Sequence, residues 1–401
     1  MPLTVADLLR KQAVVRRDAP AIQDAQGVLS FGQLDGWACR IAQALLARGV
    51  GVGDRIAVLA ENRREYIGLQ LAAAKIGAIV ACLNWRLADG EAAHCLGLVS
   101  PRLVFVSQRH AEVLARIGWA DCPVIGLDAE FDGLLAGRSE TDPAPEVDAE
   151  QGLVILYTSG TTGLPKGAVI SQRAMVARAM CFAAEYGITA EHAYVAWSPL
   201  FHMAATDFSL ATLMLGGKVI VHDGLDIDRL CATIEHETIG WLVAMPGMID
   251  LLIEGLKRHR TRPRGVRLVG AMADLVPLQQ IAELTGLLGA PYINSFGATE
   301  TETEAKKPEW FHVAQFPQAS FRSSAIKATA PGRYEVSGQL TIKGRSQPLT
   351  VPVQLAGNTA TGSFAIKRLV FGIGSGDWAD TSLVADEVQV RFRLQLSGLP
   401  Q

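Results

Sequence analysis

Residues 157–167 read YTSGTTGLPKG, and this stretch decides how the rest of the chain is interpreted. Apolar runs at 153–156 and 168–170 flank it, so we expect a strand, a loop and a second strand. The stretch contains three glycines, four Ser or Thr hydroxyls and one lysine. Glycine lets the backbone approach a ligand closely, and consecutive amides and hydroxyls can hold phosphate oxygens while Lys166 adds positive charge. The sequence therefore predicts a phosphate-binding loop.

A mobile surface loop is the alternative, because Gly, Ser and Thr are common in loops of every kind. The apolar lead-in and the Pro-Lys-Gly exit favour a binding loop over a plain linker. The stretch is not the GxxxxGK[ST] loop of the common nucleotide hydrolases, because Gly167, and not Ser or Thr, follows Lys166.

The composition is that of a globular protein with more than one domain. A chain of 401 residues is longer than a single hydrophobic core usually supports, and 49% of its residues are hydrophobic against 19% charged. The net charge of −3, from 37 basic and 40 acidic residues, argues against nucleic acid as the main partner. A basic stretch at 257–264 (KRHRTRPR) is interpreted as a solvated loop after a helix.

Several patterns bear on the compartment. The six cysteines are scattered without a CxxC pair, as in proteins of a reducing compartment. The N-terminus has Asp7 and no uninterrupted apolar core, so we expect no secretory signal. The longest apolar run, 69–83, is too short to span a membrane and is broken by Lys75 and Gly77. These patterns predict a soluble, cytoplasmic protein with no transmembrane segment.

Two regions of the chain alternate short apolar runs with amphipathic helical patterns. The expected strands are 56–59, 79–83 and 103–106 in the first region and 195–199, 218–222, 240–245, 266–270 and 291–294 in the second. Such alternation predicts βαβ units and parallel sheets. A polar, proline-containing stretch at 137–150 is expected to connect the two regions. We therefore predict α/β subdomains at 1–150 and 151–303.

The pattern changes near residue 304. Residues 333–343, 349–355 and 388–396 alternate apolar and polar side chains, with a turn at Gly344 between the first two runs. This alternation predicts antiparallel strands with one solvated face, and it contains no helix signal. The predicted fold class is thus an α/β region of two sheet subdomains followed by an all-β antiparallel half-barrel segment at 304–401.

Residues 157–167 resemble, nearly letter for letter, the phosphate-binding signature of the adenylate-forming (AMP-binding) enzymes: acyl-CoA synthetases, luciferases and adenylation domains. Three further stretches extend the resemblance, at 199–202 (PLFH), 268–272 (LVGAM) and 294–300 (NSFGATE). The acyl-CoA synthetase branch is favoured because residues 84–87 read NWRL. The turn at 268–272 would be a weak signal alone, since any βα loop may contain glycine.

The resemblance implies a set of site residues. Those implied to bind the nucleotide are Thr158, Ser159, Gly160, Thr161, Thr162, Gly163, Lys166, Gly270, Ala271, Met272, Asn294, Ser295, Phe296, Gly297 and Thr299. Those implied to act in catalysis are Thr161, Lys166, Glu300 as the Mg²⁺ ligand, and His202 as a gate over the acyl pocket. Phe296 replaces the family's tyrosine, which keeps the ring that stacks on adenine and removes one hydroxyl. For His202, a satisfied core histidine is the alternative.

The resemblance also implies a reaction. A carboxylate attacks the α-phosphorus of ATP, pyrophosphate leaves, and coenzyme A then takes the acyl group from the acyl-adenylate. ATP, Mg²⁺ and coenzyme A are the implied cofactors and co-substrates. A fatty acid is the favoured substrate, with alicyclic and aryl acids as alternatives.

The family resemblance covers residues 1–303 and then stops. The later family motifs, including the aspartate that binds ribose and the lysine of the C-terminal domain, do not follow, which implies weakened adenylation. From residue 308 the sequence instead resembles the second half of a YceI-like domain, a lipocalin-like barrel that holds isoprenoids, with matches at 308–311, 316–321, 371–378 and 384–388. An in-frame gene fusion by deletion or an assembly artefact is the simplest account, with a selected chimera as the alternative. A catalytically inactive fusion whose β tail binds lipid is therefore the second functional hypothesis.

Overall fold

The computed structural model describes residues 3–143, 146–158, 164–245, 247–271, 276–294, 308–312, 315–316, 318–381 and 386–395, with residues 271, 294, 377, 378, 391, 393 and 395 described by their backbone alone. The chain divides into two compact units, Met1–Thr299 and Glu300–Gln401, and each is described by itself.

The first sheet of unit 1 has six strands in the order β6-β5-β3-β4-β7-β8. Their bounds are β3 (Arg55–Leu59), β4 (Ile79–Cys82), β5 (Leu103–Val106), β6 (Val124–Gly126), β7 (Gly152–Thr158) and β8 (Lys166–Ser171). All neighbours are parallel except β7 and β8, which form an antiparallel hairpin. The helices that follow its strands are α3 (Arg64–Ile76), α4 (Asp89–Val99), α5 (Ala111–Arg116) and α6 (Phe131–Leu135), with a 3₁₀ turn at Gln108–His110, and α2 (Phe31–Leu46) packs on α3.

The second sheet has eight strands in the order β14-β13-β11-β9-β10-β1-β2, with β12 also paired to β11. Their bounds are β1 (Pro20–Asp24), β2 (Gly27–Ser30), β9 (Ala193–Ala196), β10 (Lys218–Val221), β11 (Thr238–Val243), β12 (Gly265–Val266), β13 (Val269–Ala271) and β14 (Tyr292–Asn294). Only the β1–β2 pair is antiparallel. The remaining helices are α1 (Val5–Val15), α7 (Gln172–Tyr186), α8 (Met203–Leu215), α9 (Ile227–His236), α10 (Ile249–His259) and α11 (Leu278–Leu288).

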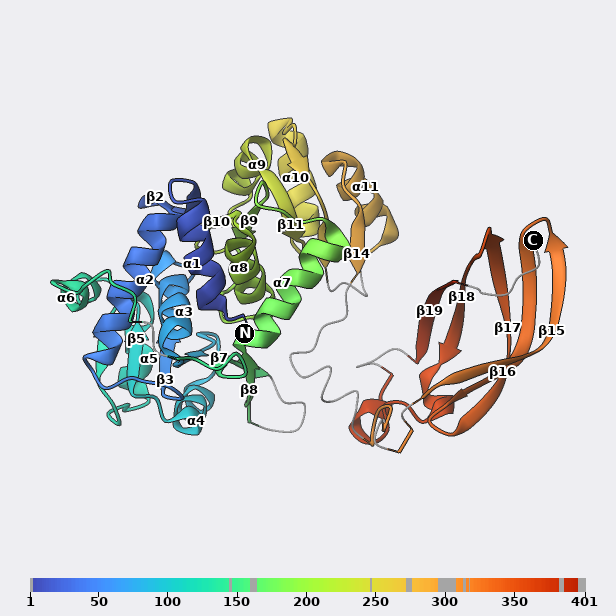
Figure 1. Cartoon of the computed structure of the whole chain (residues 1–401), viewed down its shortest axis with the longest axis horizontal. Coiled ribbons are helices and arrows are strands. Elements are labelled where there is room, and N and C mark those ends of the chain that lie inside the picture. The colour runs from blue at the N-terminus through green and yellow to red at the C-terminus, as the bar shows by residue number, and fades with distance from the viewer. Residues whose placement is uncertain are drawn as a thin grey trace. The chain divides into compact units, whose positions relative to one another are not determined.

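Helices from both sheets form one shared layer (Figure 1). The helix α3 packs on β4 and β7 of the first sheet, whereas α8 packs on β9 and β10 of the second, and the two helices contact each other. One continuous hydrophobic core therefore includes residues of both sheets, and a smaller core lies between the first sheet and α4. The α/β class predicted for this region is confirmed.

Local sequence signals explain several of these elements. Thr4 and Asp7 form a reciprocal capping box at the start of α1, and Ser30 and Gln33 form another at the start of α2. Both boxes satisfy backbone amides that a helix start leaves without partners. The apolar runs on either side of residues 157–167 form β7 and β8, as predicted.

The two sheets exchange strands across residue 150. The strands β1 and β2, from the beginning of the chain, belong to the second sheet, while β7 and β8, which follow residue 150, complete the first. The subdomain limits predicted at 1–150, 151–303 and 304–401 stay predictions, and the sheets do not divide at residue 150.

Unit 2 contains a five-stranded antiparallel sheet of β15 (Ser320–Ala330), β16 (Arg333–Ile342), β17 (Arg345–Ala356), β18 (Thr359–Lys367) and β19 (Glu387–Gln395). It forms the red and orange strands of Figure 1. The predicted antiparallel class is confirmed, and the turn predicted at Gly344 is present, with a positive φ of 72°. Two 3₁₀ turns, Arg368–Phe371 and Gly376–Ala379, were not predicted; four residues are too few to give a helical period.

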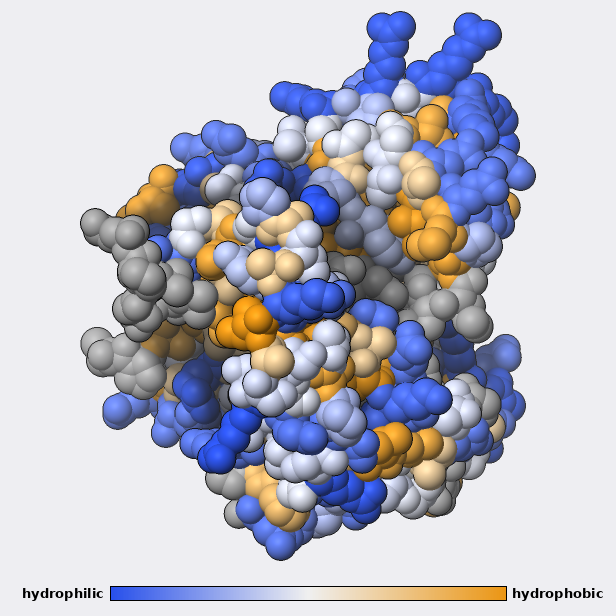
Figure 2. Space-filling model, turned by 90° about the vertical axis from the view of Figure 1, so that its right-hand side faces the viewer, coloured by the Kyte–Doolittle hydropathy of each residue, from blue (hydrophilic) through white to orange (hydrophobic). Residues whose placement is uncertain are grey.

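The buried core of unit 2 is small. Its buried cluster consists of Leu340, Phe371 and Ile373, and every residue of β15 is exposed. Exposed apolar side chains include Ile326 (66%) and Leu394 (53%). Apolar residues also reach the surface on the face of the molecule in Figure 2. Within the part of the chain that the structure describes, no helix has the length and apolar character needed to cross a membrane.

Candidate active site

The carboxyl ends of the parallel strands of both sheets meet at a junction held by Asn62. This residue follows β3, and its amide nitrogen donates to the carbonyl oxygens of Ala196 (3.0 Å), the last residue of β9, and Ser198 (2.8 Å), just beyond it. Its amide oxygen accepts from the backbone of Leu200 at 2.8 Å. Ligands of open α/β sheets bind outside the carboxyl ends of strands, so this junction is the place to look for a site.

Aromatic rings from both sheets pack together at the junction. Trp85, which follows β4, stacks on His110 with 5.3 Å between ring centroids and meets Phe201 edge-on at 5.8 Å. The exposed Arg86 places its guanidinium 4.7 Å from the Trp85 ring centroid, a cation–π distance. His202 lies 4.6 Å from Phe201 and is the N-cap residue of α8. The junction thus combines apolar rings with one fixed positive charge.

Desolvation and the charge of Arg86 lower the pKa of His202. His202 is therefore neutral near pH 7; Phe201 covers part of its ring, and the residue keeps enough solvent-accessible surface to count as exposed. An uncharged ring beside Phe201 suits contact with an apolar group better than a charged one would.

A polar group lies next to the rings. The Ser107 hydroxyl donates to Glu61 Oε2 at 2.6 Å, and His110 Nε2 lies 3.7 Å from the same oxygen. Desolvation lowers the pKa of His110, although Glu61 opposes the shift. Sequence reasoning missed Asn62, Glu61 and His110, because each acts through contacts distant in sequence; their positions directly after strands are the one local signal.

The predicted phosphate loop starts at Thr158, the last residue of β7, and ends at Lys166, the first residue of β8. These two residues face each other across the hairpin. His94 Nε2 lies 3.1 Å from the Pro165 oxygen, and the Tyr157 hydroxyl donates to the Cys95 oxygen at 2.9 Å, so α4 holds the base of the loop. The remaining loop predictions, Ser159, Gly160, Thr161, Thr162 and Gly163, lie outside the described residues.

The other predicted nucleotide residues belong to neighbouring strand ends of the second sheet. Gly270 and Ala271 end β13, and Asn294 ends the adjacent β14, with Ala271 opposite Asn294. The residues predicted beyond these ends lie outside the described part: Met272, Ser295, Phe296, Gly297, Thr299 and Glu300. The assigned roles of all these residues, and of His202, stay predictions.

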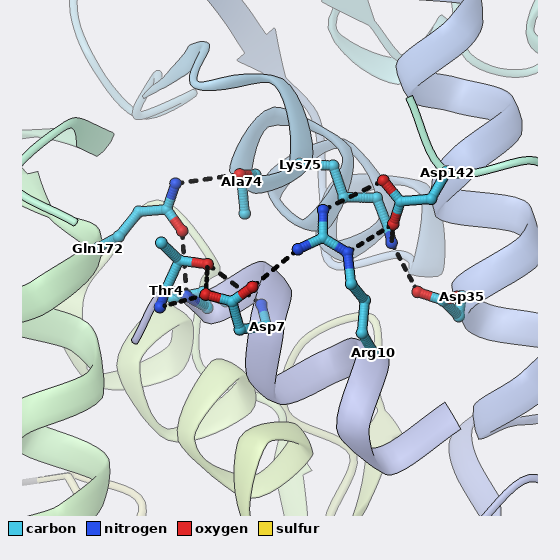
Figure 3. A network of polar contacts seen from close by, with 9 residues as sticks. Thr4, Asp7, Arg10, Asp35, Ala74, Lys75, Asp142 and Gln172 are labelled. Atoms are coloured by element: carbon cyan, nitrogen blue, oxygen red, sulfur yellow. Dashed lines mark hydrogen bonds and ion pairs between the residues drawn. The ribbon is translucent and has the colours of Figure 1, made fainter. Parts of the chain in front are cut away.

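Among the residues that the structure describes, one group of side chains could coordinate a cation, namely Asp35, Cys39 and Asp142, but a lysine already occupies the space between its carboxylates. Lys75 Nζ lies 2.7 Å from Asp35 and 2.6 Å from Asp142, and Asp142 also accepts from Arg10 Nε at 2.7 Å (Figure 3). Burial tends to lower the pKa of Lys75, but the two carboxylates raise it overall. This cluster fixes α1, α2, α3 and the segment after α6 to one another.

Comparison with known protein families identifies the family of this chain. Residues 9–314 match the family of AMP-binding enzymes, and residues 292–396 match the YceI-like domain. The chain belongs to the AMP-binding enzyme family. The predicted combination with a YceI-like segment is confirmed, as is the likeness to acyl-CoA ligases. Enzymes of the AMP-binding family use ATP and coenzyme A.

Curated relatives are ligases of different acids. Indoleacetate–CoA ligase of Aromatoleum aromaticum is 30% identical over 309 residues, covering 75% of this chain and 60% of its own length. Long-chain-fatty-acid–CoA ligase FadD13 of Mycobacterium tuberculosis is 29% identical over 253 residues, covering 61% of this chain and 50% of its own length. The chain thus spans about half to three fifths of the length of these relatives.

Solved structures show the same fold. A putative long-chain-fatty-acid CoA ligase from Rhodopseudomonas palustris has a TM-score of 0.69 at 22% identity, covering 86% of this chain and 90% of that one. ATP-bound MatB from the same organism has a TM-score of 0.64 at 22% identity, covering 86% and 71%.

Proposed function

We propose that unit 1 binds ATP and activates a carboxylic acid as an acyl-adenylate for transfer to coenzyme A. The observation that carries the proposal is the YTSGTTGLPKG signature, which occupies the β7–β8 hairpin of the first sheet. Membership of the AMP-binding family supports the reaction class. The proposed acid is a fatty or an aryl acid, because the names of the relatives include ligases of both kinds. The cytoplasm remains the predicted location.

In the proposed reaction, the substrates themselves supply the attacking group and the leaving group of each step. A carboxylate oxygen attacks the α-phosphorus of ATP, and pyrophosphate leaves. The coenzyme A thiolate then attacks the acyl carbon, and AMP leaves with the electron pair of the broken C–O bond. The loop from Thr158 to Lys166 would hold phosphate oxygens, and a Mg²⁺ ion at Glu300 stays a prediction, because Glu300 lies outside the described residues.

We further propose that turnover is weak. The motif that supplies the family's ribose aspartate does not follow residue 303, where the YceI-like segment stands instead. Losing one preorganised contact to the transition state typically lowers the rate roughly 100- to 1000-fold. Acid-dependent exchange of labelled pyrophosphate into ATP should therefore be slow, and exchange at rates normal for the family would contradict this part.

Binding is tested separately from turnover by ATP-dependent thermal protection. Lys166→Ala should weaken ATP binding roughly 10- to 100-fold, as expected for loss of a charged hydrogen bond. Lys11→Ala is the matched control, because Lys11 is an exposed lysine of α1 far along the chain from the loop. Absence of nucleotide protection in the unchanged chain would refute the proposal.

Unit 2 supports a second candidate function, the binding of an isoprenoid or other lipid. The supporting observation is its exposed apolar side chains, among them Ile326 and Leu394, together with the YceI-like match. Mass spectrometry of organic extracts of the purified chain tests this candidate. The candidate would be contradicted if the purified chain carries no lipid from cells and added isoprenoid does not raise its thermal stability.

A further inference from the structure

The five-stranded sheet of unit 2 has two open edges. Within the described part of the chain, β15 pairs with β16 alone and β19 with β18 alone, so each has one row of backbone amides and carbonyls with no strand beside it. The strand β15 is eleven residues long, contains neither Gly nor Pro, and has Arg322 and Lys327 as its charged residues. A long edge strand with few charges pairs readily with a further strand.

The apolar face of this sheet becomes more exposed toward both edges. On the inner strands Val351 is 3% exposed and Ala360 is 5% exposed. Ile326 of β15 lies on the same face as Val351, because both pair with Val336, and it is 66% exposed. Leu394 of β19 pairs with Ala360 and is 53% exposed. The apolar layer is therefore covered in the middle of the sheet and uncovered at its two edges.

This distribution indicates what kind of partner fits. Among the described residues of the five strands, the large apolar side chains that are exposed all lie on β15 or β19: Phe321, Ile326, Val388 and Leu394. A lipid lying across the sheet would cover its middle and leave the edge amides and carbonyls unpaired. A further strand at each edge would cover these side chains and pair the backbone as well. The fitting partner is a protein with two free strand edges.

A second copy of this sheet offers both edges through one two-fold axis. Antiparallel neighbours alternate in direction, so β15 and β19, the first and fifth strands, run the same way. An axis perpendicular to the strands reverses the direction of the second copy. The strand β15 then meets the second β15, and β19 meets the second β19, both as antiparallel pairs. Ten strands would close into a barrel with no edge left open.

The sequence of β15 permits this pairing. Its register is regular over Ala325–Ala328, between two irregularities. A two-fold axis at Ile326 places the two Ile326 side chains opposite each other on the apolar face. The same axis places Lys327 opposite Ala325 of the second copy, so like charges do not face each other at the centre of the pairing.

The available area is close to what a stable dimer needs. Five strands spaced ~4.8 Å apart, with ~3.4 Å per residue over about ten residues, present a face of roughly 800 Å². The buried cluster around Phe371 covers the end of the face near Ile342 and Leu349, and about half of the face stays open. Two copies would bury roughly 800 Å² of open face in addition to both edges, near the ~1,000 Å² of a specific interface.

We propose that two copies of the chain associate through unit 2, with β15 and β19 each pairing with its counterpart to close a ten-stranded barrel. Eight strands already enclose an interior that side chains fill or that holds one small ligand, and ten strands enclose a wider one. The closed barrel would also enclose the lipid of the second candidate function, but the association does not depend on that lipid.

Sedimentation of the full chain across a dilution series tests the association. We expect twice the 42.9 kDa mass of one chain at high concentration and dissociation on dilution. Ile326→Lys places two ammonium groups side by side at the axis and should weaken the association roughly tenfold or more. Ala365→Lys is the matched control, because Ala365 is exposed on the polar face of the inner strand β18, and it should leave the association unchanged.

Cysteine cross-linking tests the register. Directly opposite residues of an antiparallel pair have Cα atoms ~4.5–5.5 Å apart, within the ~4.4–6.8 Å range of disulfides. The natural cysteines all lie at or before residue 231, so Ile326→Cys adds the one thiol of unit 2. Mild oxidation should link two copies of this variant, whereas Ala365→Cys should give no more linked dimer than the unchanged chain does.

The mass of a single chain at every concentration would overturn the proposal, as would a monomer that carries lipid on unit 2. An Ile326→Lys chain that associates as tightly as the unchanged one would overturn it too, since this exposed side chain is not part of the buried core. Equal cross-linking of Ile326→Cys and Ala365→Cys would exclude the pairing of β15 with its counterpart.

Discussion

Replacing Asp142 with asparagine should destabilise unit 1, because it removes a carboxylate that two cations share. Lys75 has no exposed side-chain surface and lies 2.6 Å from Asp142, and Arg10 donates two hydrogen bonds to the same carboxylate (Figure 3). After the change, the anionic neighbours that remain within the described residues are Asp35 for Lys75 and Asp7 for Arg10.

The magnitude follows from burial. Removing one partner of a fully buried ion pair costs about 3–5 kcal/mol. Asp142 is 25% exposed and Lys75 retains Asp35. We therefore expect Asp142→Asn to lower the free energy of unfolding by about 2–3 kcal/mol. Lys75→Met leaves the carboxylates of Asp35 and Asp142 close together without their shared cation, so it should also lower the free energy of unfolding, by about 1–3 kcal/mol, since Asp142 keeps Arg10.

The double variant distinguishes this reasoning from a general packing defect. Without the Lys75 charge, Asp142→Asn leaves no buried ammonium short of a partner, so its cost in the Lys75→Met background should fall by about 2 kcal/mol. Hydrogen exchange at α3 peptides across a urea series measures opening of this region without a signal from unit 2. Costs that add within about 0.5 kcal/mol would refute the charge-based explanation.

Three further changes have expected outcomes of their own. Asn62→Ala removes a hydrogen bond from each of three backbone groups at the sheet junction, of which the Ala196 oxygen keeps its bond from the His222 amide, and should lower stability by about 1–3 kcal/mol in thermal unfolding, with Asn62→Asp retaining only the acceptor. Arg86→Gln should raise the pKa of His202 in an NMR titration, because Arg86 contributes to its lowering, and an unchanged pKa would contradict this. Burial, with a smaller effect of Arg229, lowers the pKa of His222 from 6.5 to about 4. Above pH 6.5 His222 is neutral in both the folded and the unfolded chain, so it costs no stability. As the pH falls to 4, protonation of the unfolded chain should lower the free energy of unfolding by about 3 kcal/mol. Urea unfolding at pH 7 and pH 4.5 measures this loss, and His222→Asn should remove it.

Local sequence signals predicted the elements that depend on neighbours along the chain. Capping boxes at Thr4 and Ser30 mark helix starts because donor and acceptor are three residues apart. Apolar runs before and after residues 157–167 predicted β7 and β8 in the same way. Strict alternation at 333–343 predicted β16, because a strand with one solvated face repeats every two residues.

Contacts distant in sequence were beyond such reasoning. Nothing near Trp241 indicates that its ring would lie against Gly270, and nothing near Asn62 indicates that it would hold the segment after β9. Strand partners could not be predicted either, because the alternation of apolar and polar residues indicates which face of a strand is buried but not which strand pairs with it. The hairpin of β1 and β2 at the edge of the second sheet is the clearest example.

That hairpin also constrains the order in which the chain can fold during synthesis. Ile22 pairs with Val219, 197 positions later, so β1 has no sheet to join until β10 has left the ribosome. At about 5–20 residues per second, the delay is roughly 10–40 s. During this interval the apolar side chains of α1 and β1 have no native partner from the second sheet. A ribosome-associated chaperone has its longest opportunity to bind the nascent chain here, and slow codons before residue 219 should increase aggregation more than slow codons after it.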